Sequence, residues 1–128
     1  MATETPADRA RHALLALHKS IIDATRDAIE KSEGVKPSPN QLLQRLVSAP
    51  ELAWLGALTS LIVRLDEAME PDATESPAAV VAYAVDLLTP GDEESTHAFK
   101  IGYARALQDS PHVVLAHRAA MLALRAIA

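Results

Sequence analysis

The chain has 128 residues, the usual size of one domain around a single hydrophobic core. It contains no cysteine, which excludes disulfide bonds, thiolate nucleophiles and cysteine-ligated metal sites. Its net charge is -5, and its 12 lysine and arginine residues are scattered among 17 acidic residues instead of forming the basic patch of a nucleic-acid binder. We therefore expect a single domain over residues 1–128 without a nucleic-acid partner.

Apolar segments long enough for targeting or membrane insertion are missing from the sequence. The opening stretch, MATETPADRARH, has no apolar core of the kind that a secretory signal needs. No later run approaches the roughly 20 uncharged apolar residues of a membrane helix. We expect a cytoplasmic protein without a membrane partner.

Serine or threonine followed by proline marks the expected helix starts. Proline lacks an amide hydrogen and suits the first helical turn, while the preceding hydroxyl caps free backbone N–H groups. In the segment SAPE, Ser48 is the expected cap and Glu51 completes a capping box. The other pairs are Thr5-Pro6, Ser38-Pro39, Ser76-Pro77, Thr89-Pro90 and Ser110-Pro111. We expect helices over residues 6–32, 39–48, 50–69, 77–88, 91–108 and 111–127.

Apolar residues repeat at helical spacing within these ranges. In the first range, Leu14, Leu17 and Ile21 recur at intervals of three and four. No stretch alternates polar and apolar residues as a half-buried strand would, and no Asn-Gly or Asp-Gly marks a hairpin. The 25 alanines favour closely packed helices. The sequence therefore predicts an all-α fold, a compact bundle of about six helices with four long ones and two short connectors, the second and the fourth.

Two of the predicted helices are apolar on nearly every side. Residues 52–63, LAWLGALTSLIV, carry no charge, and residues 112–128 carry only two arginines and two histidines. A domain of this size has room for about one such central helix, so the second one indicates a partner surface. We expect a homodimer through either helix or both, the alternative being that both stack in one core. The candidate interface is the stripe Val114, His117, Met121 and Leu124.

The segment DSPHVVLAH, residues 109–117, places several reactive side chains close together. We interpret it as a helix start, with Ser110 as the cap and Pro111 in the first turn. His112 and His117 are five residues apart, which separates them by about 140° around a helix, so one ion cannot bind both. His117 shares an apolar stripe, and we expect a hydrogen-bonded histidine there.

Metal and catalytic motifs are weak. Glu94 and His97, in ESTH, have the Glu-x-x-His spacing of di-iron bundles, but the sequence holds no second copy. Acidic residues in a first turn also complement the helix dipole. The sequence has no Gly-x-Ser-x-Gly elbow, and its four glycines are isolated, so no phosphate-binding loop is indicated. We expect no metal, no cofactor and no catalytic set.

A polar pair offers the alternative to a surface function. His18 lies beside the apolar stripe of the first helix, and Asp66 follows that of the third. If these helices pack antiparallel, an imidazole-to-carboxylate bond can form across their seam. The first hypothesis is a binding or regulatory module, with a homodimer or another protein as the partner. The second is a small enzyme or ligand carrier with a pocket between helices near His18, Trp54, Asp66, Tyr83 and Tyr103.

Several short segments resemble a group of small bacterial helical proteins that have no established activity. These segments are Leu17-His18-Lys19, Gln41-Leu42-Leu43, Ala53-Trp54-Leu55, Leu61 to Glu67 and Val113 to His117. They are packing patterns, and the first four lie in the first part of the chain. The resemblance implies a helical fold and assigns no functional residue.

Overall fold

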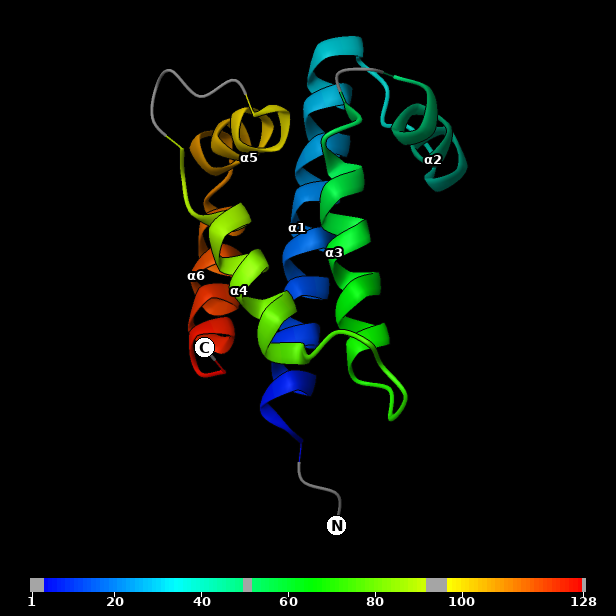
Figure 1. Ribbon diagram of the computed structural model, residues 1–128. Coiled ribbons are helices and arrows are strands. Elements are labelled where there is room, and N and C mark those ends of the chain that lie inside the picture. The colour runs from blue at the N-terminus through cyan, green and yellow to red at the C-terminus, as the bar shows by residue number, and fades with distance from the viewer. Residues whose placement is uncertain (1–3, 50–51, 92–96, 128) are drawn as a thin grey trace.

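The computed structural model describes residues 4–49, 52–91 and 97–127, which form six helices and no strand. The all-α bundle expected from the sequence is confirmed (Figure 1). The helices are α1 (Pro6–Glu33), α2 (Pro39–Ser48), α3 (Leu55–Ala68), α4 (Pro77–Leu88), α5 (Ala98–Asp109) and α6 (Pro111–Arg125).

Four of the six expected helix starts are confirmed. Each of these helices has proline in its first turn, and the hydroxyl before it accepts a hydrogen bond from the backbone N–H three residues further on. The caps are Thr5, Ser38, Ser76 and Ser110, with oxygen-to-nitrogen distances of 3.1 to 3.4 Å. The crowded segment 109–117 is therefore the entrance of α6.

The other two expected starts are wrong, because the hydroxyl there ends the preceding helix. Ser48 is the last residue of α2 and donates to the carbonyl of Gln44 at 2.7 Å. Thr89 is the C-cap of α4 and donates to the carbonyl of Val85 at 2.6 Å. Proline also pushes the residue before it out of helical geometry, so a Thr-Pro step can close a helix as well as open one. Glu51, the other half of the expected capping box, lies outside the described residues.

Four helices form the bundle, and they alternate in direction. α1 contacts α3 and α6, and α4 contacts the same two helices, so the four close into a ring. α1 and α4 run one way while α3 and α6 run the other (Figure 1). The expectation that the fourth helix is only a connector is wrong, since α4 contributes five buried residues to the core.

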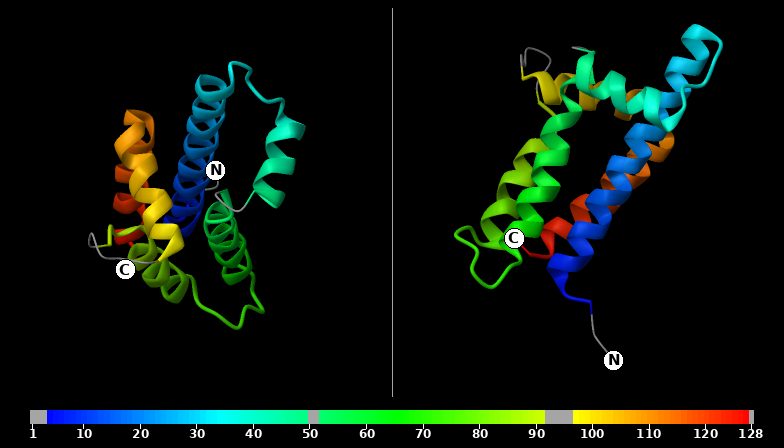
Figure 2. Two further views of the ribbon diagram at one scale, coloured as in Figure 1. Left: turned by 90° about the horizontal axis from the view of Figure 1, so that it is seen from above. Right: turned by 90° about the vertical axis from the view of Figure 1, so that its right-hand side faces the viewer.

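The two remaining helices, α2 and α5, lie across the same end of the bundle, where α1 ends and α3 begins (Figure 2). α5 packs on α4 and α6, whereas α2 has a single buried residue, Leu42. Both helices cap the bundle instead of lengthening it. The fifth helix is shorter than expected because it begins at Ala98 and not at residue 91.

The core is apolar and contains several small side chains. Ala10 on α1 and Ala120 on α6 have no exposed surface, and α1 and α6 form the most extensive contact of any helix pair. Alanine permits this close approach because its side chain is a single methyl group. Apart from the Tyr103 hydroxyl, no polar or charged residue is buried in the described part of the chain.

Candidate functional site

The seam between α1 and α3 separates the two residues of the predicted polar pair. His18 Nε2 lies 3.2 Å from the hydroxyl of Thr59, and Asp66 pairs instead with Arg11, whose Nε is 3.3 Å from the carboxylate. The helices are antiparallel, as the prediction assumed. The register differs, because seven residues, or about 10 Å along a helix, separate Thr59 from Asp66. The expected bond between His18 and Asp66 is therefore wrong.

His18 is half-buried at this seam. Burial lowers the pKa of its imidazole, because a charged ring loses hydration there. Asp66, the carboxylate expected beside it, does not compensate for this loss because it pairs with Arg11. His18 thus provides a neutral hydrogen-bonding group in the seam, and its partner is a hydroxyl.

Aromatic rings form a row at the capped end of the bundle. Trp54 packs edge-on against Phe99 with ring centroids 5.6 Å apart, and Phe99 stacks on Tyr103 at 5.2 Å. Tyr103 in turn faces His117, with a centroid distance of 5.5 Å. The row joins the start of α3 to α5 and α6. Two residues expected to line a pocket, Trp54 and Tyr103, are therefore part of the packing.

Gly102 explains how Trp54 reaches α5. A Cβ atom at this glycine would lie 2.5 Å from the indole ring, closer than any real contact allows. Position 102 must therefore lack a side chain for the indole to pack there. The sequence shows an isolated glycine in a helix, which signals a close approach without naming its partner.

One hydrogen bond joins two side chains within the aromatic row, and it lies between Tyr103 and His117. The Tyr103 hydroxyl and His117 Nδ1 are 2.6 Å apart. Burial raises the pKa of the Tyr103 phenol, so it remains protonated and donates to the imidazole. The pKa of His117 is lowered, first by burial and then by the positive charge of Arg125. A neutral, hydrogen-bonded histidine agrees with the expectation for residue 117.

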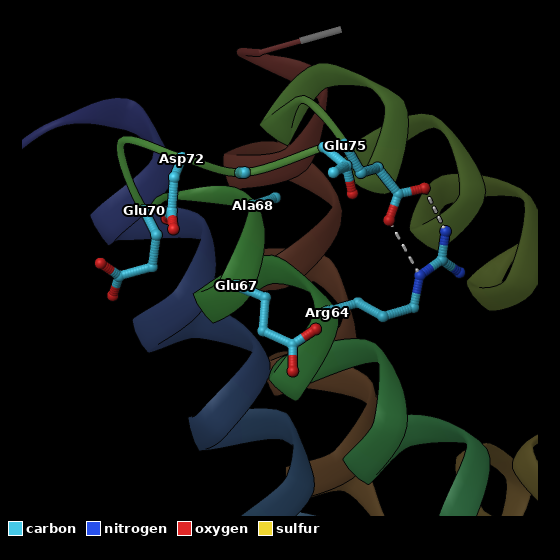
Figure 3. Close-up of a pocket in the computed structure, with 8 residues that line it drawn as sticks. Arg64, Glu67, Ala68, Glu70, Asp72 and Glu75 are labelled. Carbon is cyan, nitrogen blue, oxygen red and sulfur yellow. Dashed lines mark hydrogen bonds and ion pairs between the residues drawn. The ribbon is translucent and has the colours of Figure 1, made fainter.

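Tyr83 lies away from this row, midway along α4. Its ring is 44% exposed, and the guanidinium of Arg64 stacks on it at 4.6 Å from the centroid. Arg64 also forms two hydrogen bonds to Glu75, at 3.2 and 2.6 Å (Figure 3). The hydrogen bond to Glu75 raises the pKa of Arg64. This cluster fastens the loop between α3 and α4.

Two hollows are described, and both are lined mainly by polar residues. One, of about 310 Å³, lies between the end of α3 and the α3–α4 loop, with Glu67, Glu70 and Asp72 along its wall (Figure 3). The other, of about 440 Å³, lies between the end of α1 and α2 and is lined by Glu33 and Arg45, which pair with each other. Neither hollow includes a residue expected to line an inter-helical pocket.

The weak metal motif falls partly outside the described residues. Glu94 lies there, and His97 is the N-cap of α5 without a capping hydrogen bond from its side chain. Within residues 4–49, 52–91 and 97–127, no three histidine or acidic side chains are grouped so that they could hold a metal ion. None of the helices described is both long and apolar enough to cross a membrane.

The candidate interface stripe of α6 is divided between the core and the surface. Leu124 is fully buried and Met121 nearly so, and the His117 ring is hydrogen-bonded to Tyr103. Val114, 44% exposed, is the one residue of the four that lies on the surface. α6 has apolar residues at intervals of three and four on more than one face. The spacing alone therefore does not indicate which face is buried.

A second stripe on α6 faces outward, and the sequence reasoning missed it. Leu115 and Leu122 are each 65% exposed, and Ala119 and Ala126 are exposed between and beyond them. These four residues, Leu115, Ala119, Leu122 and Ala126, are called the outer stripe below. Its spacing of four, three and four is the signal that could have identified it.

Comparison of the chain with protein-family models, with curated proteins and with solved structures gives no match. The function is therefore inferred from this chain's own residues.

Proposed function

We propose that this chain is a binding module that acts as a homodimer through the outer stripe of α6. The observation that carries the proposal is the pair of leucines, Leu115 and Leu122, 65% exposed and two helical turns apart. Leucines in this position are favoured where a second helix covers them, because isolated surface helices usually present charged residues on that face. On α6 the residues between the two leucines include Ala119, which leaves room for a close neighbour.

The outer stripe is complementary to itself. When two copies of α6 run antiparallel about a twofold axis, Leu115 can lie against Ala126 of the second copy, and Ala119 against Leu122. Every leucine then faces an alanine, which is the alternation of large and small side chains that lets helices interdigitate. Antiparallel helix dipoles also attract each other. Closed twofold pairing uses the same patch on both copies.

The size of the patch sets the expected strength. Burying the exposed part of one leucine contributes about 1 to 2 kcal/mol. Four leucines in the dimer therefore contribute roughly 4 to 8 kcal/mol, against an association cost of about 4 to 15 kcal/mol. The most favourable balance of these two ranges is about 4 kcal/mol, so we expect a weak dimer with a Kd of about 1 mM, which exchanges with the monomer.

Sedimentation equilibrium over about 0.1 to 3 mM spans that Kd and tests the proposal. The mass is expected to rise from monomer to dimer, and Leu122→Glu is expected to stay monomeric because it buries a charge in the seam. The matched control is Leu43→Glu on α2, where the leucine is 59% exposed but outside the outer stripe. A native chain that is monomeric throughout, or equal effects of the two glutamates, would contradict the proposal.

A further inference from the structure

The arginines of the chain divide into paired and unpaired groups. Arg11, Arg45 and Arg64 pair with carboxylates, and the other arginines before residue 100, Arg9 and Arg26, donate to backbone carbonyls. In the described residues of α5 and α6, the three arginines have neither an ion pair nor a hydrogen bond. These three are Arg105, Arg118 and Arg125.

Two of the unpaired arginines border the outer stripe. Arg118 and Arg125 directly precede Ala119 and Ala126, and both are exposed. They are seven residues apart, so they lie on the same edge of α6, about 10 Å from each other along its axis. No residue of α6 is acidic, so the helix itself offers them no counter-charge.

In the antiparallel homodimer proposed above, the arginine edges of the two copies lie on the same side of the seam. This follows from helix geometry, because residues that precede the contact positions face their equivalents in an antiparallel pair. Arg118 is then level with residue 123 of the second copy, two residues or about 3 Å from the level of Arg125 there. Each end of the seam therefore brings together two guanidinium groups that have no partner among the described residues of their own chain.

We propose that the dimer seam forms two identical oxyanion sites, each made by Arg118 of one copy and Arg125 of the other, and that the ligand is a phosphoryl group. The proposal rests on the homodimer, since neither copy contains a complete site. Two converging cations repel each other, and a doubly charged anion between them removes that repulsion. Guanidinium groups suit a phosphoryl group because each can donate two parallel hydrogen bonds to its oxygens. The ligand and the second copy then bind cooperatively.

The test is the dimer Kd, measured by sedimentation equilibrium in chloride and in inorganic phosphate at equal ionic strength and pH 7.5. We expect phosphate to lower the dimer Kd about tenfold when it is present above its own binding constant. Pyrophosphate forms a second arm, because a stronger effect than that of phosphate indicates a ligand with a longer phosphoryl chain. Equal effects indicate a single phosphoryl group.

The double variant Arg118→Gln/Arg125→Gln separates the site from a general effect of phosphate on apolar association. It is expected to form the dimer in chloride at least as well as the native chain and to ignore phosphate. Arg105→Gln, also unpaired but on α5, is the control and is expected to keep the native response. A native Kd that is the same in both buffers, or a double variant that still responds, overturns the oxyanion site and leaves the homodimer standing. A double variant that is monomeric where the native chain is dimeric also overturns the site, because the arginines would then stabilise the seam instead of repelling each other. If the native chain is monomeric in both buffers, the homodimer itself fails.

Discussion

The inner and outer faces of α6 carry similar apolar residues in opposite surroundings. Val113, Ala120 and Leu124 are fully buried against the bundle, whereas Leu115 and Leu122 are 65% exposed. Packing against α1 determines which face of α6 is buried, because the small residues of α1 fit closely against the inner face. One helix therefore supplies apolar surface to the core on one face and, in the proposed homodimer, to association on the other. Substitutions on the two faces should then change different free energies.

The largest expected effect is on the inner face. Leu124→Ala should lower the free energy of unfolding by about 2 to 5 kcal/mol, because it leaves a cavity in a packed core. Leu122→Ala on the outer face should change the unfolding free energy of the monomer by about 0.5 kcal/mol or less. Urea denaturation at low protein concentration measures both. Equal losses for the two leucines would show that the faces do not differ as described.

The next largest effect is expected at the aromatic row. Gly102→Ala should destabilise the fold by about 1 to 3 kcal/mol, because the new methyl group overlaps Trp54. Gly56→Ala, on α3, is the matched control, since a Cβ there meets nothing within 4 Å. The control should stabilise the helix by about 0.5 to 1 kcal/mol. Thermal unfolding of both variants checks this, and a stabilised Gly102→Ala would mean that the indole does not lie on α5.

Much of the fold could be predicted from the sequence because local rules govern it. Ser38 and Ser110 each occur at a proline step where hydroxyl capping and proline geometry agree, and both helices begin there. The failures at Ser48 and Thr89 arise because the same hydroxyl can bond backward to a carbonyl. The spacing of residues in the sequence does not indicate whether the hydroxyl caps the following helix or bonds back to the preceding one.

The candidate site was less predictable because it depends on register and on partners distant in the chain. His18 meets Thr59 and not Asp66 because of an offset of two turns, which only the packing of complete helices determines. The sequence suggests Tyr103 as a pocket residue and His117 as an interface residue, so it does not connect the two. Their hydrogen bond depends on how α5 crosses α6. The outer stripe was visible as a pattern, but a second apolar stripe on the same helix competed with it.

A smaller effect tests the hydrogen bond between the row and α6. Tyr103→Phe should cost about 1 kcal/mol of unfolding free energy, because it removes the hydroxyl and leaves His117 Nδ1 without its donor. Ring packing with Phe99 is retained in the variant. Chemical denaturation at pH 7.5 measures the loss. No loss at all would indicate that water replaces the hydroxyl at no cost.

The smallest expected effect is a pH dependence. Burial lowers the pKa of His18 and of His117 from 6.5, the ordinary value, so the unfolded chain binds these protons more tightly than the folded protein does. Stability should therefore be highest above about pH 6.5 and decline as the pH falls from there toward the folded pKa values. The variant His18→Gln/His117→Gln should flatten that decline in denaturation curves from about pH 8 to 5. An unchanged decline would assign it to other groups.

The most direct test of the central claim uses the absence of cysteine from the native chain. In the proposed pairing Ala119 faces Leu122 of the second copy, so Ala119→Cys/Leu122→Cys should oxidise to a covalent dimer with two bridges, seen on a non-reducing gel. Leu43→Cys/Val47→Cys on α2, where both side chains are exposed, is the control and should remain monomeric at the same concentration. A covalent dimer from the first variant alone is the predicted result. Monomer from both, or the same amount of dimer from both, would contradict self-association through the outer face of α6.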